Sequence, residues 1–192
     1  METNQVYLDS VKKQFRYYKM LGEKAMEQVT PEQLFLAPND DSNTIASVVK
    51  HLWGNMRSRW TEFLTTDGEK EWRDRDAEFE VVQQDPTEVM KQWNEGWACL
   101  FDALESIEPN QLMDIIYIRN EGHTVMDAIN RQLAHYPYHV GQIIYAAKAL
   151  KEGAWNSISV PKNQSKQYNH AKFAQDKGIR HFVDGEVKRL ES

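Results

Sequence analysis

Four long stretches of the sequence repeat apolar side chains at steps of three and four residues, and this periodicity constrains the fold most strongly. Such spacing places the apolar side chains on one face of a helix. The stretches span about residues 4–28, from Ser42–Thr44 to Thr65, 86–107 and 124–151. Because each helix has a separate apolar face to bury, we predict an all-α fold in which the four helices pack as a bundle.

The segments that join these helices differ in length. Residues 66–84 are charged and weakly periodic, and a connection of this length in a compact domain indicates a functional or partly structured loop. It allows the second and third helices to lie parallel, with a crossover, without forcing that arrangement. Residues 114–118 (DIIYI), followed by Asn120-Glu121-Gly122, favour a short hairpin before the fourth helix.

The chain divides near Gly153, a residue that suits the end of the fourth helix. We expect a bundle over residues 1–153 and a C-terminal extension over residues 154–192. The first part of the extension is too apolar for a solvated linker, so we expect it to pack on the bundle.

Charge and cysteine content exclude several classes of protein. With 23 Lys and Arg against 29 Asp and Glu, the net charge of −6 argues against binding to nucleic acid or to anionic membranes. Cys99 is the single cysteine, which excludes an internal disulfide and thiolate-rich metal sites, and we expect it to be a buried, inert thiol. The sequence has no apolar run long enough to span a membrane and does not start like a signal peptide, so we expect a cytoplasmic protein.

The feature that carries chemistry is His135-Tyr136-Pro137-Tyr138-His139. Residues four apart on a helix differ by about 40° in direction, so two imidazoles with this spacing can bind one divalent ion. Tyr136 replaces the glutamate of the zinc-protease motif, and Pro137 is expected to kink the helix. By spacing alone, two partly exposed histidines without a ligand remain the alternative.

A third histidine, His51, lies at the edge of the apolar stripe of the second helix. His135 and His139 lie at the edge of the stripe of the fourth, so all three can face one cleft between two helices. The alternative for His51 is a hydrogen-bonded histidine at the boundary of the core.

Several other polar side chains fall near the histidines at helical spacing and can point toward the same cleft. They can orient a ligand, support a histidine or, for the tyrosine, donate a proton. Ordinary surface or interhelical contacts, and packing for the tyrosine, are the favoured alternative. These residues are Asn55, Arg59, Arg131, Tyr138 and Gln142.

VVKHLWGNMRSRW (residues 48–60) and INRQLAHYPYHVGQIIYAAK (residues 129–148) resemble the DinB-like superfamily of metal-binding four-helix bundles. This superfamily includes YfiT-like metal hydrolases and bacillithiol S-transferases. The resemblance covers about residues 3–151, and residues 155–169 resemble an extension carried by one subgroup.

The resemblance implies one histidine ligand from the second helix and two from the fourth, which match His51, His135 and His139. It also implies an up-down-down-up bundle whose long connection lies between helices 2 and 3, in agreement with the loop at residues 66–84. DinB-like bundles often look dimeric, and the six tryptophans exceed what one small core needs, so we expect a homodimer.

Three nitrogen ligands leave a coordination position open, as in catalytic sites. All-nitrogen ligation favours zinc or nickel, with iron or manganese as alternatives. Resemblance to bacillithiol S-transferases favours transfer of a low-molecular-weight thiol to an electrophilic small molecule. The alternatives are a hydrolase that uses a metal-bound water, disfavoured because the motif places no glutamate base, and a non-catalytic dimeric binding protein.

Overall fold

The computed structural model describes residues 3–80 and 84–191 of the chain. Within them the fold is mostly helical, which confirms the all-α prediction in its broad form. The elements are α1 (Thr3–Met26), η1 (Glu32–Phe35), α2 (Ile45–Trp60), η2 (Ala77–Phe79), α3 (Pro86–Ser106), η3 (Pro109–Met113), β1 (Ile115–Ile118), β2 (Glu121–Thr124), α4 (Val125–Leu150), α5 (Ser165–Phe173) and α6 (Phe182–Glu191). The η elements are short 3-10 helices.

Local capping explains where three of the long helices begin. The side chains of Thr44, Asp85 and Thr124 each accept a hydrogen bond from a backbone N–H in the first turn of α2, α3 and α4. The end of α2 was predicted too late: the helix stops at Trp60 rather than near Thr65. Thr61 has an extended backbone conformation, which ends the helix. The apolar spacing in the sequence continues past this residue, so the periodicity did not mark the end of the helix.

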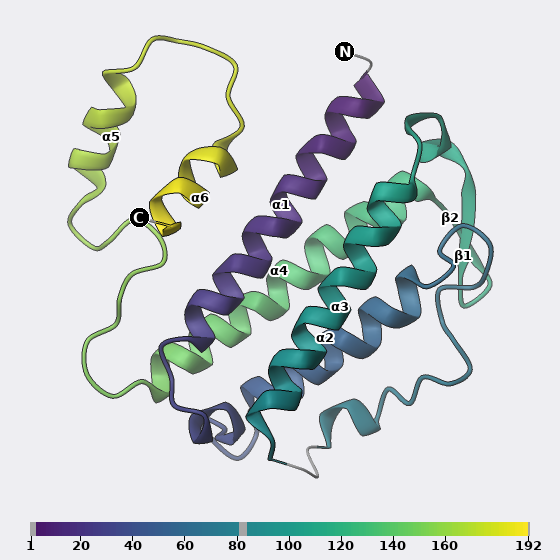
Figure 1. Ribbon diagram of the computed structural model, residues 1–192, viewed down its shortest axis with the longest axis horizontal. Helices are drawn as coiled ribbons and strands as arrows, with labels where there is room; N and C mark the ends of the chain where they lie inside the picture. Colours follow the sequence, from purple (N-terminus) through teal and green to yellow (C-terminus); the bar gives the residue numbers. More distant parts are fainter. Residues whose placement is uncertain (1–2, 81–83, 192) are drawn as a thin grey trace.

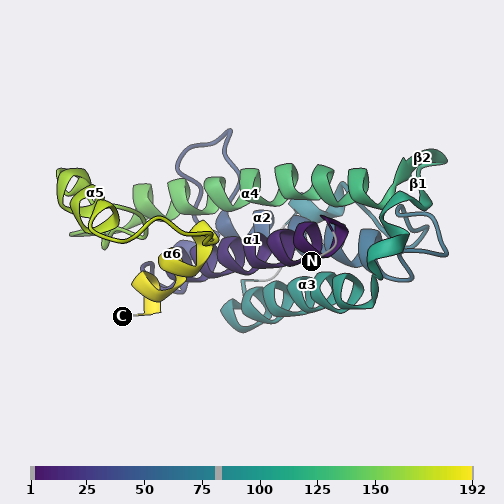
Figure 2. The ribbon, with the colours of Figure 1, turned by 90° about the horizontal axis from the view of Figure 1, so that it is seen from above.

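The four long helices share a hydrophobic core. α2 packs mainly against α3, α1 packs against α4, and α2 also contacts α4 (Figures 1 and 2). The largest fully buried side chains include Trp93, Trp97, Tyr136 and Phe15. Because Trp93 and Trp97 fill the core of the chain itself, the tryptophan content does not call for a second copy, and the homodimer stays a prediction.

The strands β1 and β2 form the hairpin that the sequence favoured before the fourth helix. They are antiparallel, with Ile115 opposite Thr124 and Ile118 opposite Glu121. Burial of Ile116 and Ile118 ties one face of the hairpin to the core, which stabilises a sheet of two strands that would be marginal alone.

The connection from α2 to α3 is ordered in the part that the structure describes, while residues 81–83 lie outside the described residues. Its Asp67 carboxylate accepts hydrogen bonds from the backbone N–H groups of Arg119 and Asn120 at the hairpin tip. Further along, Lys50 of α2 donates to the backbone carbonyls of Ala77 and Glu80. The connection is therefore held against both the hairpin and α2, as the partly structured alternative required.

The C-terminal segment folds into two short helices that the sequence did not predict. Figures 1 and 2 show α5 standing apart from the long helices and α6 lying beside α1. Lys13 of α1 forms an ion pair with Asp184 at 2.8 Å, and Ser10 hydrogen-bonds His181 at 3.0 Å. α5 contributes no buried side chain. The division of the chain at residues 153 and 154 stays a prediction.

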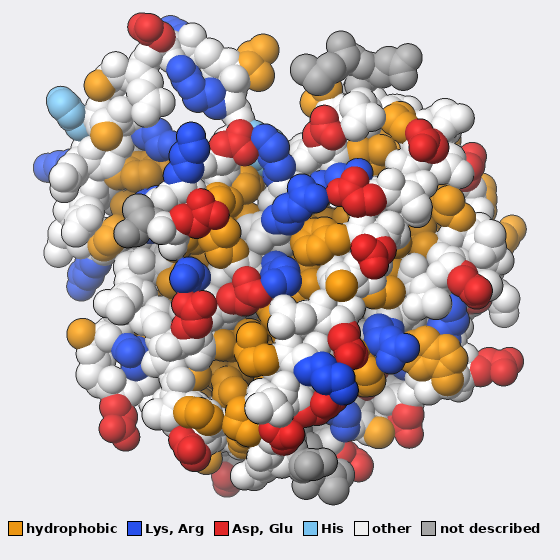
Figure 3. Space-filling model, in the orientation of Figure 1, with side chains coloured by type: hydrophobic (Ala, Val, Ile, Leu, Met, Phe, Trp, Pro, Cys, Tyr) orange, Lys and Arg blue, Asp and Glu red, His pale blue; other side chains and the backbone are white. Residues whose placement is uncertain are grey.

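The surface mixes charges of both signs with apolar side chains over the face drawn in Figure 3. Among the described residues, no helix has the length and apolar character needed to cross a membrane.

Candidate metal centre

Three histidines from two helices converge at the seam between α2 and α4. One ring nitrogen each of His51, His135 and His139 lies within 4.8 Å of the other two. The Nε2 atoms of His135 and His139 are 3.0 Å apart. Metal–nitrogen bonds of about 2 Å hold ligand nitrogens about 3–4 Å from one another. The three side chains therefore need only small shifts to enclose one ion.

The helix that carries two of the histidines runs through a proline. α4 continues past Pro137 to Leu150, and Figure 2 shows no sharp bend anywhere along α4, so the expected kink is not seen. The flanking residues Tyr136 and Val140 are fully buried. Their packing on the core holds the helix straight, which keeps His135 and His139 one turn apart on the same face.

Every imidazole of this cluster also has an oxygen acceptor at its outer nitrogen, Nδ1. The pairs are His51 with Glu78 Oε2 at 2.8 Å, His135 with Gln132 Oε1 at 3.2 Å, and His139 with Gln142 Oε1 at 2.7 Å. An acceptor at Nδ1 places the ring proton there and leaves the lone pair on Nε2.

This proton placement tests whether the residues fit a metal ion. With both protons on Nδ1, the Nε2 atoms of His135 and His139 present two lone pairs to each other at 3.0 Å, an arrangement that a cation between them would relieve. Burial, reinforced by the nearby His139 and His51, lowers the pKa of His135 to about 3. Burial likewise lowers the pKa of His139 to about 4. Both rings are therefore neutral at pH 7, the state that binds metals, and the donor set fits a divalent ion.

Glu78 is the residue of this site that sequence reasoning missed. It lies in η2, is 4% exposed, and binds Arg73 Nε at 2.7 Å as well as His51. Burial acts to raise its pKa, but the hydrogen bonds from His51 and Arg73 outweigh it and lower the pKa. An ionised carboxylate thus faces His51. Its position in a charged, aperiodic connection offered no signal.

Close packing at Gly54 makes room for this glutamate. A Cβ atom built on Gly54 would lie 2.1 Å from Glu78 Oε1, so a side chain at this position of α2 would displace the carboxylate. On the other side, the ring of Phe79 stacks on His51 with centroids 5.0 Å apart. His51 is therefore held from two directions by the connection.

The residues predicted to support the site take different positions. Gln142, which was predicted, hydrogen-bonds His139. Gln132, which was not predicted, hydrogen-bonds His135. Its spacing was a usable signal, because Gln132 precedes His135 by three residues just as Gln142 follows His139 by three. Asn55 is buried and accepts a hydrogen bond from Tyr136 at 3.1 Å. Among the described contacts, a direct hydrogen bond to a histidine of the cluster is found for Gln142 alone within the predicted set.

A cavity of about 440 Å³ opens beside the histidines. The other predicted residues, Arg59, Arg131 and Tyr138, line it together with Asn55. Arg59 is 5% exposed and binds Glu69 at 3.0 Å; burial lowers its pKa despite that contact. The complete lining is His51, Asn55, Arg59, Arg73, Arg75, Phe79, Arg119, Arg131, Gln132, His135, Tyr138 and His139.

Cys99 takes no part in this cavity. It is half-buried on α3, 3.7 Å from the hydroxyl of Thr61, and burial raises the pKa of its thiol. A thiol with a raised pKa is a poor nucleophile, which agrees with the inert role expected from the sequence.

Comparison with known proteins places most of the chain in one family. The model of a family described as "Protein of unknown function (DUF1572)" matches residues 2–164, a range that contains all three histidines and ends just before α5. No curated protein and no solved structure matches the chain.

Proposed function

The chain belongs to DUF1572, a family of proteins of unknown function, and we propose that it is a divalent-metal-dependent enzyme that transfers a low-molecular-weight thiol to an electrophilic small molecule. The observation that carries the proposal is the convergence of three imidazoles whose outer nitrogens are all hydrogen-bonded to oxygen. In this proposal His51, His135 and His139 hold the ion, which is zinc or nickel, with iron or manganese as alternatives.

His51, His135 and His139 would hold the ion as three neutral ligands, and the ion would supply Lewis acidity that favours the thiolate form of a thiol. The thiol loses its proton to solvent, its sulfur forms a bond to the electrophilic carbon, and the leaving group departs with the electron pair of the bond that breaks. The protein positions the reactants: Gln132, Gln142 and Glu78 fix the imidazoles, and the adjoining cavity receives the organic part of the thiol.

The partners of Glu78 favour thiol transfer over hydrolysis. Hydrolysis by a metal-bound water usually needs a general base, whereas a thiolate is already deprotonated. Glu78 is engaged by His51 and Arg73, and no carboxylate lines the cavity among the described residues. A transfer reaction does not need such a base.

We also propose that the helices form the up-down-down-up bundle of DinB-like proteins. Contacts at both ends of α1 and α4 support a common direction: Tyr7 donates to the Met126 carbonyl at 3.2 Å, and Gln33, just after α1, donates to the Leu150 carbonyl at 2.8 Å. Figure 1 supports the same arrangement.

The experiment has two stages. Metal analysis of the purified protein is expected to find close to one divalent ion per chain. The protein loaded in turn with Zn²⁺, Ni²⁺, Mn²⁺ or Fe²⁺ is then mixed with a thiol, such as cysteine or mercaptosuccinate, and 1-chloro-2,4-dinitrobenzene. We expect metal-dependent formation of the thioether.

His135→Ala serves as the negative control, since it removes one proposed metal ligand and keeps the other residues that line the cavity. A protein that binds metal and forms no thioether with any thiol, but cleaves ester or amide substrates, would replace this proposal by the hydrolase. If the protein binds no metal, the remaining alternative is that it is a non-catalytic binding protein.

A further inference from the structure

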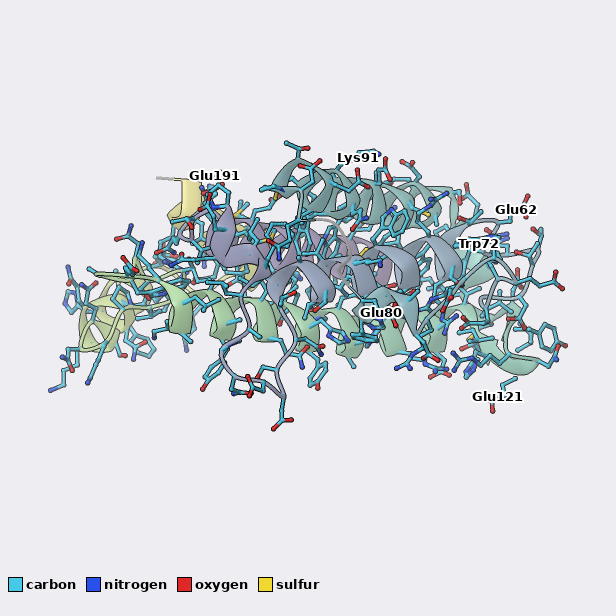
Figure 4. All side chains as sticks on the ribbon, turned by 90° about the horizontal axis from the view of Figure 1, so that it is seen from below. Glu62, Trp72, Glu80, Lys91, Glu121 and Glu191 are labelled. Atoms are coloured by element: carbon cyan, nitrogen blue, oxygen red, sulfur yellow. The ribbon has the colours of Figure 1, made fainter. Side chains whose placement is uncertain are left out.

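Five of the twelve side chains that line the cavity are arginines. They come from four parts of the chain: α2, the connection before α3, the hairpin tip and α4. They are Arg59, Arg73, Arg75, Arg119 and Arg131. Figure 4 shows nitrogen-tipped side chains gathered between the labelled Glu80 and Glu121.

Two carboxylates neutralise part of this charge. Glu69 forms ion pairs with Arg59 at 3.0 Å, with Arg73 at 3.4 Å and with Arg119 at 3.0 Å. Glu78 pairs with Arg73 at 2.7 Å. Five guanidinium groups against two carboxylates leave an excess of three positive charges, in a chain whose net charge is −6. This local excess of positive charge favours an anionic ligand in the cavity.

Two of the arginines have no carboxylate partner within the described part of the chain. Arg75 lies over the ring of Phe79, 5.8 Å from its centroid, and that ring stacks on His51. Arg131 lies on α4, one turn before His135. Both guanidinium groups are exposed and line the cavity, so they can receive an anion next to the histidines.

A third arginine, Arg59, is buried with one of its hydrogen-bond donors unpaired among the described residues. Arg59 is 5% exposed, and its Nε–H has no acceptor among the described residues. A buried donor that lacks an acceptor is unfavourable, because it has lost its hydrogen bonds to water. Negative charge brought into the cavity by a ligand would offset this cost, because it acts on a desolvated guanidinium.

We infer that this arginine cavity binds a small organic anion, a carboxylate or a phosphate, beside the three histidines. The guanidinium group matches both oxyanions through paired hydrogen bonds, and a volume of about 440 Å³ is in the range of small-molecule sites. The inference rests on the proposed function for the role of the anion, which is the charged end of the thiol substrate. In that role Arg75 and Arg131 would hold the anionic end of the substrate, and the three histidines would hold the ion that binds its sulfur.

Calorimetric titration with two probes, succinate and inorganic phosphate, tests this site. The protein is stripped of metal with a chelator, dialysed free of the chelator, and titrated at low salt with and without Zn²⁺. We expect the metal-free protein to bind at least one probe. Tighter binding of succinate identifies a carboxylate ligand, and tighter binding of phosphate identifies a phosphorylated one.

The variants are R75Q combined with R131Q, and R57Q as a matched control. Arg57 is likewise an exposed arginine, but it lies on α2 and stacks on Trp53 and Trp72, outside the cavity. We expect the double variant to bind the probe at least 10-fold more weakly and to keep its metal content, while R57Q leaves both unchanged. A double variant that binds as tightly as the unmodified protein, or an unmodified protein that binds neither probe, would overturn the inference.

The two proposals fail in different ways. If the double variant no longer binds the anion but His135→Ala keeps its full metal content, the anion site is supported and the thiol-transfer role is refuted. Normal metal binding without any anion binding would remove the anion site alone.

Discussion

The Nδ1 atom of His51 lies 2.8 Å from Oε2 of Glu78, although the two residues are 27 positions apart and belong to different elements. Both side chains are nearly inaccessible, with 5% and 6% of their surfaces exposed. A carboxylate at the outer nitrogen of a metal-binding histidine fixes the ring and makes its other nitrogen more basic. In this protein the connection between α2 and α3 supplies a carboxylate to the outer nitrogen of His51.

Glu78→Gln is expected to weaken metal binding by about 10- to 100-fold, because the amide keeps the shape of the side chain and removes the charge that orients His51. Competition with a chromophoric chelator measures the change in affinity. Glu80→Gln, a nearby exposed glutamate, is the matched control and should leave the affinity unchanged. Equal affinities in the two variants would show that the contact does not support the metal.

Gly54→Ala should weaken metal binding through the same contact, since the new methyl group would lie 2.1 Å from Glu78 Oε1 and force the carboxylate away. Gly141→Ala on α4 is the control, because a Cβ there meets none of the described atoms within 4 Å. In a helix, that control change is expected to stabilise the fold by up to about 1 kcal/mol. Metal titration and thermal unfolding of both variants separate the two effects. Unaltered metal affinity in Gly54→Ala would mean that the connection adjusts to the methyl group.

His135→Ala or His139→Ala is expected to abolish stoichiometric metal binding, and His51→Ala to weaken it strongly. Two nitrogen ligands leave a divalent ion bound mostly by water, so the affinity falls steeply. Metal analysis after dialysis against a weak chelator measures the loss, with circular dichroism to check the fold and His170→Ala on α5 as the control. A full metal complement in all three variants would refute the metal site.

The metal-free protein should lose stability as the pH falls. The pKa values of His135 and His139 are lowered from 6.5 to about 3 and about 4, so between these values and 6.5 the unfolded chain binds more protons than the folded one. The free energy of unfolding therefore decreases as the pH drops from about 6.5 toward 4. Urea unfolding across this range measures it, and His135→Gln combined with His139→Gln should flatten the dependence. The same slope in the variant would assign the effect to other groups.

Tyr136→Phe is expected to cost about 1–3 kcal/mol of stability without loss of metal. The hydroxyl accepts a hydrogen bond from Trp60 at 2.9 Å and donates one to Asn55 at 3.1 Å, all in the core. Its removal leaves two buried polar groups unpartnered. Urea unfolding measures the change, and Tyr145→Phe, at an exposed position of α4, is the control. If Tyr136→Phe lowers the free energy of unfolding no more than Tyr145→Phe does, the polar groups of Trp60 and Asn55 find other partners.

The helical content and the candidate histidines could be predicted from local features of the sequence. Helix periodicity, the caps at Thr44, Asp85 and Thr124, and the spacing of His135 and His139 are local properties, because each depends on residues within one or two turns. The edge position of His51 on its stripe allowed it to face the other two histidines but left a hydrogen-bonded histidine at the core boundary as the alternative. The resemblance to DinB-like proteins is what singled it out as a ligand.

The part of the surroundings that comes from other segments of the chain depends on the tertiary structure. Glu78 and Arg75 reach the site from a connection without periodicity, and Arg119 reaches the cavity from a hairpin tip. Their positions depend on long-range contacts, such as those of Asp67 with the backbone at the hairpin tip, that no local pattern encodes. The charge of the cavity is the clearest case: a chain with a net charge of −6 gathers five arginines around one cavity only when four separate segments are folded together.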